Sequence, residues 1–120
     1  LTLPIDFASS DNLNYTGTVQ NNGGSVLFQQ SSYNLYASYV IPTGVTLRSY
    51  IFYGVAGVKA NVYVGNITGS AVTTLDTDIS PSATSTLSGG SPVGDGEHYV
   101  IVKLNILGSK QFYGGKFIYA

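Results

Sequence analysis

The only histidine in the chain stands in a short acidic stretch, Gly94-Asp95-Gly96-Glu97-His98. Acids beside a histidine are residue types used in general acid–base catalysis and in metal ligation. A metal site needs three or four converging ligands, and a Ser-His-Asp site needs a placed serine, but the pattern G-x-S-x-G does not occur. Because successive side chains of a strand alternate between its faces, Glu97 and His98 would point apart. We interpret His98 as the entry to a strand, and we expect no catalytic residues.

A second acidic pair is Asp76-Thr77-Asp78. The D-x-D pattern occurs in calcium loops, because carboxylate oxygens suit this hard cation, although the complete EF-hand spacing is missing. The six acids are scattered, and no pair is set apart as the two carboxylates that glycoside hydrolysis requires. We expect Asp76 and Asp78 as candidate calcium ligands, with calcium as the candidate cofactor and no enzymatic activity.

The tyrosines are a more informative set, since the chain has 10 Tyr and 5 Phe but no Trp. Tyr36, Tyr63 and Tyr99 fall on the polar faces of predicted strands. A ring beside Asn and Lys side chains can stack on the apolar face of a sugar while its neighbours bond the hydroxyls. The alternative is that strands favour Tyr and that other parts of the fold cover these rings. The predicted ligand-binding residues are Asn61, Tyr63, Tyr99, Lys103, Asn105 and Tyr36.

Strands must position these side chains, since apolar and polar residues alternate with a period of two. The clearest runs are 35–41, 58–64 and 99–107, in which Leu35, Val62 and Val102 and their alternate neighbours face inward. Turn signals rich in Gly and Asn separate the runs. The stretch 77–96 reads as one long Ser- and Gly-rich loop. Weaker strand candidates are 3–8, 14–20, 25–30, 45–53, 71–76 and 111–119.

Several short strands at this spacing predict an all-β fold, an antiparallel β-sandwich or jelly roll. A length of 120 residues suits one domain, 1–120, with a core of its own. Zero Cys excludes disulfides and thiolate metal sites. A net charge of −1, with 5 dispersed cations, gives no reason to bind nucleic acid. No apolar run is long enough to span a bilayer.

The order of features resembles the β-jelly-roll carbohydrate-binding modules of the galactose-binding-domain-like type, particularly families 6 and 35. In such modules a Tyr-bearing strand runs into a Val-Pro, an aromatic strand follows, and a G-x-H entry precedes a Val-rich strand. The resemblance implies a non-catalytic domain that binds polysaccharide. The corresponding stretches here are Tyr39-Val40-Ile41-Pro42, Tyr50-Ile51-Phe52, Val62-Tyr63-Val64-Gly65 and Gly96-Glu97-His98.

The chain departs from this pattern in two respects. It has no Trp, which such modules usually use for sugar binding together with Tyr. Many of them also hold a structural calcium ion with acids near the first and in the last strand. Asp6 suits the first position, but the last-strand position is Lys116, and a cation cannot ligate calcium. We expect that Asp6 and Lys116 pair instead, or that calcium binds elsewhere.

The sequence therefore predicts a carbohydrate-binding module located outside the cell or on a cell or virion surface. The absence of Met suggests a processed mature protein or an excised domain. The acceptor motifs at Asn14 and Asn66 suit secretion but arise easily by chance in a chain this rich in Ser and Thr. The alternative function is a self-assembling subunit, a homo-oligomer or filament, in an extracellular filament, sheath or capsid. It rests on the charged fraction of 9%, which leaves little repulsion between copies.

Overall fold

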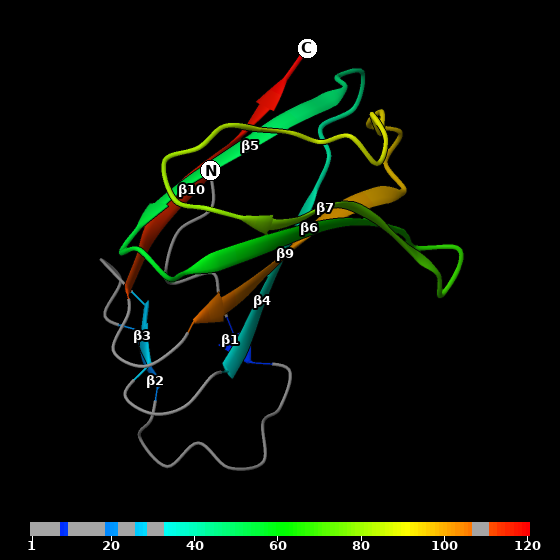
Figure 1. Cartoon of the computed structure of the whole chain (residues 1–120). Coiled ribbons are helices and arrows are strands. Elements are labelled where there is room, and N and C mark those ends of the chain that lie inside the picture. Colours follow the sequence, from blue (N-terminus) through cyan, green and yellow to red (C-terminus); the bar gives the residue numbers. More distant parts are fainter. Residues whose placement is uncertain (1–7, 10–18, 22–25, 29–32, 107–110) are drawn as a thin grey trace.

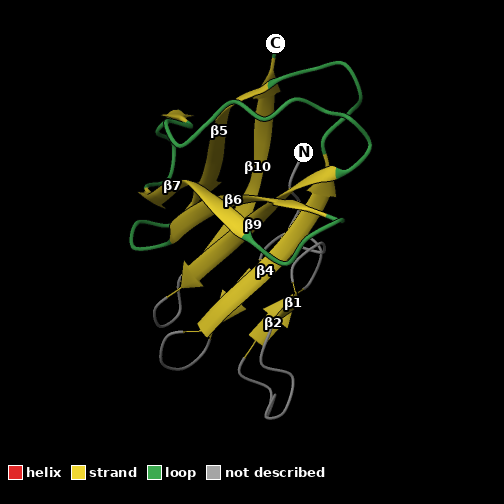
Figure 2. Ribbon diagram, turned by 90° about the vertical axis from the view of Figure 1, so that its right-hand side faces the viewer, coloured by secondary structure: helices red, strands yellow, loops and turns green. Residues whose placement is uncertain are grey.

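The computed structural model describes residues 8–9, 19–21, 26–28, 33–106 and 111–120. They form two 5-stranded antiparallel sheets, in the orders β1-β4-β9-β6-β7 and β2-β3-β10-β5-β8. Figure 1 shows β5 and β10 in one layer and β4, β6, β7 and β9 in the other, and the described part of the chain contains strands and loops but no helix (Figure 2). The strands are β1 (Ala8–Ser9), β2 (Val19–Asn21), β3 (Val26–Phe28), β4 (Tyr33–Val40), β5 (Leu47–Gly54), β6 (Lys59–Asn66), β7 (Val72–Ile79), β8 (Ser85–Thr86), β9 (His98–Ile106) and β10 (Gln111–Tyr119).

The core lies between the sheets and follows the alternation of the sequence. On β6 and β9, Ala60, Val62, Val100 and Val102 are buried, while their sequence neighbours are at least partly exposed. The second sheet contributes aromatic rings, which are larger and fill the space between the layers. Rings from the two sheets meet where Tyr39 of β4 lies edge-on to Phe117 of β10, with 5.8 Å between the ring centroids. The prediction of an all-β antiparallel sandwich is confirmed.

The strongest sequence patterns give long strands, since the runs 35–41, 58–64 and 99–107 correspond to β4, β6 and β9. Three weaker candidates, 45–53, 71–76 and 111–119, are long strands as well, namely β5, β7 and β10. The other weaker candidates, 3–8, 14–20 and 25–30, correspond in the described residues to short strands, β1, β2 and β3. A strand of two or three residues contains too few alternating positions for a period of two to be recognised in the sequence.

The stretch 77–96, which we predicted to be one loop, contains additional strand structure. β7 continues to Ile79, and Ser85–Thr86 forms β8 against β5. The register on β6 moves from Ala60 opposite Ile79 to Val62 opposite Asp76, so β7 carries one extra residue there in a bulge. Asp78 has a φ of 54° there. A bulge interrupts the alternation of inward and outward residues, which is why the pattern ended early.

Candidate functional site

The predicted ligand residues lie together on the outward face of one sheet. Strand pairing places Lys103 of β9 between Tyr36 of β4 and Asn61 of β6. In the next row, Ile101 of β9 lies opposite Tyr63 of β6. Tyr99 and Asn105 follow on the same face of β9, because alternate residues of a strand share a face.

Part of this set lines a hollow of about 240 Å³, which we call the tyrosine hollow. Its lining is Tyr36, Tyr63, Val72, Ile101 and Lys103. Both tyrosine rings and the lysine are half-buried, so each side chain is packed on one side and reachable from solvent on the other. Aliphatic carbon, two phenol groups and one ammonium group therefore meet in a single depression.

Asn61 does not line the tyrosine hollow but holds one of its walls. The Asn61 side-chain nitrogen donates to the Tyr63 hydroxyl at 3.1 Å. Its Oδ1 accepts the backbone N–H of Asp78 at 2.8 Å, which ties the amide to the bulge in β7. With both ends of the amide in use, Asn61 positions the Tyr63 ring.

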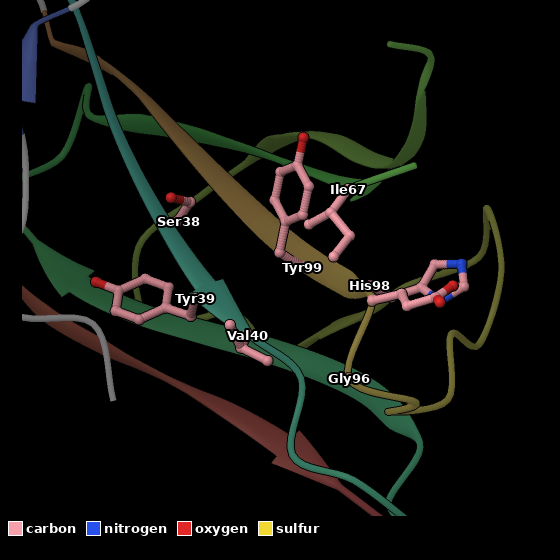
Figure 3. A pocket seen from close by; sticks show the side chains of 8 residues that line it. Ser38, Tyr39, Val40, Ile67, Gly96, His98 and Tyr99 are labelled. Carbon is pink, nitrogen blue, oxygen red and sulfur yellow. The ribbon is translucent and has the colours of Figure 1, made fainter. Parts of the chain in front are cut away.

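Tyr99 belongs to a second hollow of about 300 Å³, which we call the Tyr99 hollow. Its ring lies over Gly65, where a Cβ atom would come within 2.6 Å of the ring. Glycine at this position therefore leaves room for the Tyr99 ring to pack against the backbone of β6. Figure 3 shows Ile67 beside the Tyr99 ring. The lining of the hollow is Ser38, Tyr39, Val40, Ile67, Gly96, Glu97, His98 and Tyr99.

The predicted platform is thus divided between two hollows, which share no lining residue. Asn105 is exposed and lines neither of them. Sequence reasoning did not select Val72 or Ile101, which complete the tyrosine hollow. Because Val102 was predicted to face inward, alternation places Ile101 on the outward face, and an aliphatic residue on a polar face was the signal available for it.

The acidic stretch before β9 forms a compact hydrogen-bonded turn. Asp95 Oδ1 accepts the backbone N–H groups of Glu97, at 2.8 Å, and His98, at 3.0 Å. Asp95 Oδ2 lies 2.7 Å from His98 Nδ1, and His98 Nε2 lies 3.4 Å from the side-chain nitrogen of Asn66. His98 is the first residue of β9, so the strand-entry interpretation is confirmed.

These hydrogen bonds stabilise the charged form of Asp95. They lower the pKa of its carboxyl from 3.8 to about 2, first through the N–H of Glu97, then through the His98 ring and the His98 N–H. A carboxylate that accepts several N–H donors is harder to protonate. The described residues contain no group of three or more His, Asp or Glu side chains arranged to hold a metal ion.

Of the residues predicted to bind calcium, Asp76 has structural partners, while Asp78 is exposed in the bulge of β7. Asp76 accepts hydrogen bonds from the backbone N–H of Thr77 and from the hydroxyl of Ser85, which links β7 to β8 across the two sheets. Asp6 lies outside the described residues, and so does any pairing of it with Lys116, which is exposed on β10. Calcium binding by Asp6, Asp76 and Asp78 stays a prediction.

No protein-family model matches the chain, and no curated protein matches it. One solved structure that matches is described as TmCBM61 in complex with beta-1,4-galactotriose. It is 13% identical, the match covers 95% of this chain and 86% of that chain, and the TM-score is 0.48. The resemblance to families 6 and 35 in particular stays a prediction. In the described residues, no helix is long and apolar enough to cross a membrane.

Proposed function

We propose that the protein binds carbohydrate without chemical turnover, and that the tyrosine hollow is the binding site. The observation that carries the proposal is the convergence of Tyr36, Tyr63 and Lys103 with the aliphatic side chains of Val72 and Ile101 around one hollow. An extracellular or surface location is the expectation that accompanies this function.

The chemistry of the hollow suits a sugar ring. A pyranose has an apolar face of C–H groups and a rim of hydroxyls, and aromatic rings bind such a face while polar groups fix its orientation. The phenol hydroxyls can donate and accept hydrogen bonds, and the Lys103 ammonium donates charge-assisted ones, which are stronger than neutral ones. Because Asn61 bonds the Tyr63 hydroxyl, that ring is held in place before a ligand arrives.

The lining also supports binding without catalysis. Hydrolysis of a glycosidic bond uses two carboxyl groups on either side of the bond. The described lining of the tyrosine hollow contains no carboxylate and no histidine. Lys103 lies between Tyr36 and Asn61, where it can donate to a hydroxyl but has no neighbouring acid among its strand partners.

Binding to an array of plant, microbial and animal glycans, followed by calorimetry on the best ligand, tests the proposal. We expect Tyr36→Ala and Tyr63→Ala each to weaken binding at least about tenfold, which corresponds to about 1.4 kcal/mol. Lys103→Met should weaken glycan binding as well, because the methionine side chain keeps the aliphatic packing while the hydrogen-bond donor of the ammonium group is lost. Tyr53→Ala and Tyr113→Ala are matched controls, since both rings are exposed on the other sheet, at 45% and 48%.

Two outcomes would contradict the proposal. One is a folded wild-type protein that binds none of the glycans, and the other is an equal loss of binding in the Tyr53→Ala control.

The second candidate function is that of a subunit of an extracellular filament, sheath or capsid. It is favoured by exposed aliphatic residues on the same sheet, Val40 at 67% and Val72 at 52%. Polymers in light scattering together with no glycan binding would support that function instead.

A further inference from the structure

The turn between β6 and β7 presents an acceptor motif for N-linked glycans, Asn66-Ile67-Thr68. The motif requires Asn, any residue except Pro, and Ser or Thr. The turn is open to solvent, with Ile67 70% exposed and Thr68 and Gly69 also exposed. The other motif, at Asn14, lies outside the described residues.

Local hydrogen bonds orient the Asn66 side chain. Its Oδ1 accepts both the backbone N–H of Thr68, at 2.9 Å, and the Thr68 hydroxyl, at 2.8 Å. Such bonds form between residues two apart and do not depend on the rest of the fold. With the oxygen anchored to Thr68, the Asn66 nitrogen points toward His98, whose Nε2 lies 3.4 Å away.

The Asn66 nitrogen is therefore at the rim of the Tyr99 hollow, because His98 and Ile67 both line that hollow. The hollow is apolar on one side, where the Tyr99 ring and Ile67 lie next to each other (Figure 3). Val40, 67% exposed, belongs to the same lining. A hollow with exposed apolar side chains and a polar rim is the kind of surface that a sugar ring covers.

We propose that Asn66 carries an N-linked glycan and that the first sugar of this glycan lies in the Tyr99 hollow. The donor is an oligosaccharide linked to a lipid pyrophosphate. The Asn66 nitrogen bonds to the anomeric carbon as the bond from that carbon to pyrophosphate breaks. The lipid pyrophosphate leaves, and the amide gives up one proton to a base of the transferase.

The modified site is separate from the tyrosine hollow, since the two hollows have no lining residue in common. The inference is therefore independent of the proposed function. The attached sugar covers Ile67 and the outer side of the Tyr99 ring, both of which otherwise face water.

Secretion of the full chain from cells that perform N-glycosylation tests the site. Trypsin cuts after Arg48, Lys59 and Lys103, so the peptide 60–103 carries Asn66 and separates it from Asn14. We expect a glycan on Asn66, seen as a mass increase of this peptide that peptide-N-glycosidase removes while converting Asn66 to Asp. Thr68→Val should lower occupancy at least about tenfold, and Thr68→Ser should keep it, because the hydroxyl is retained. Thr74→Val, an exposed threonine outside the motif, is the control for folding.

The placement in the hollow has its own measurement. Trimming the glycan to a single N-acetylhexosamine allows nuclear Overhauser contacts to be recorded between sugar protons and the protein. We expect contacts to the Tyr99 ring and to the Ile67 methyl groups. An unmodified Asn66 in a folded, secreted chain, beside a co-secreted glycoprotein that is modified, overturns the site. A glycan that contacts neither side chain overturns its placement in the hollow.

Discussion

At the scale of single residues, Asp95 organises the start of β9. Its Oδ1 accepts the N–H groups of Glu97 and His98, and its Oδ2 contacts the His98 ring. The turn also joins its neighbours, since the backbone N–H groups of Ile41 and Ile67 donate to the carbonyl oxygens of His98 and Glu97. Acidic residues beside a histidine often form catalytic sites, but in this protein they form a turn that joins the segments at Ile41, Ile67 and the start of β9.

The charge of Asp95 makes this turn sensitive to acid. Its folded pKa, about 2, is below the ordinary value of 3.8, so ionised Asp95 stabilises the fold above about pH 4. That contribution is lost as the pH falls through about 2. We expect Asp95→Asn to lower the melting temperature at pH 6, and the gap to the wild type to shrink between about pH 4 and pH 2. Thermal melts across this range would contradict the prediction if the gap stayed constant.

At the scale of elements, the faces of β5 show how alternation separates core from surface. Phe52 is fully buried, and its ring stacks with that of Phe112 at a centroid distance of 5.9 Å. Tyr53, the next residue, is 45% exposed on the outer face. The same alternation on β4, β6 and β9 turns Tyr36, Tyr63 and Lys103 outward, so the candidate site depends on the register of these strands.

Substitutions at these adjacent positions should differ sharply in cost. Phe52→Ala removes a buried ring and leaves a cavity, and we expect a loss of about 3–5 kcal/mol in the free energy of unfolding. Tyr53→Ala should cost less than about 1 kcal/mol, because its ring is largely in solvent. Denaturant unfolding followed by circular dichroism measures both. Equal losses in the two variants would contradict the placement of Phe52 and Tyr53 on opposite faces of β5.

At the scale of the whole molecule, the segment after β7 fastens the two sheets to each other. Gly89 donates its N–H to Leu75 of β7, and Leu87 donates to Arg48 of β5. In Figure 1 this segment, coloured yellow-green to yellow, passes from the end of β7 across to the side of β5. Farther on, Gly94 donates to Val45 at 2.8 Å and accepts from Gly44 at 3.0 Å. A stretch whose composition suggests a free loop is therefore built into the fold.

The close approach at Gly94 leaves no room for a side chain. A Cβ atom there would lie 1.8 Å from the Pro42 carbonyl oxygen and 2.5 Å from its carbon. Backbone atoms cannot move aside as a flexible side chain can, so we expect Gly94→Ala to cost about 1–3 kcal/mol or more. Gly69→Ala is the matched control, since a Cβ atom there meets nothing within 4 Å. A Gly94→Ala protein as stable as the Gly69→Ala protein would contradict this packing.

Much of the architecture was predictable from local patterns. Period-two alternation indicated β4, β6 and β9, together with the inward position of Val62 and Val102 and the outward position of Tyr63 and Lys103. The strand entry at His98 was predictable as well, because one histidine without other ligands rarely makes a site. The bulge at Thr77 and Asp78 was not, since an inserted residue hides the alternation that identifies a strand.

The sequence by itself determined the regularly alternating strands β4, β6 and β9 and the faces on which their side chains lie, because these follow from backbone geometry within a few residues. Only the tertiary structure decided which outward residues meet. Strand pairing set Lys103 beside Tyr36, and the amide of Asn61 fixed Tyr63, whereas Tyr99 turned toward Ile67 and His98 in a separate hollow. Register and packing depend on contacts between residues far apart in the chain, so local periodicity holds no information about them.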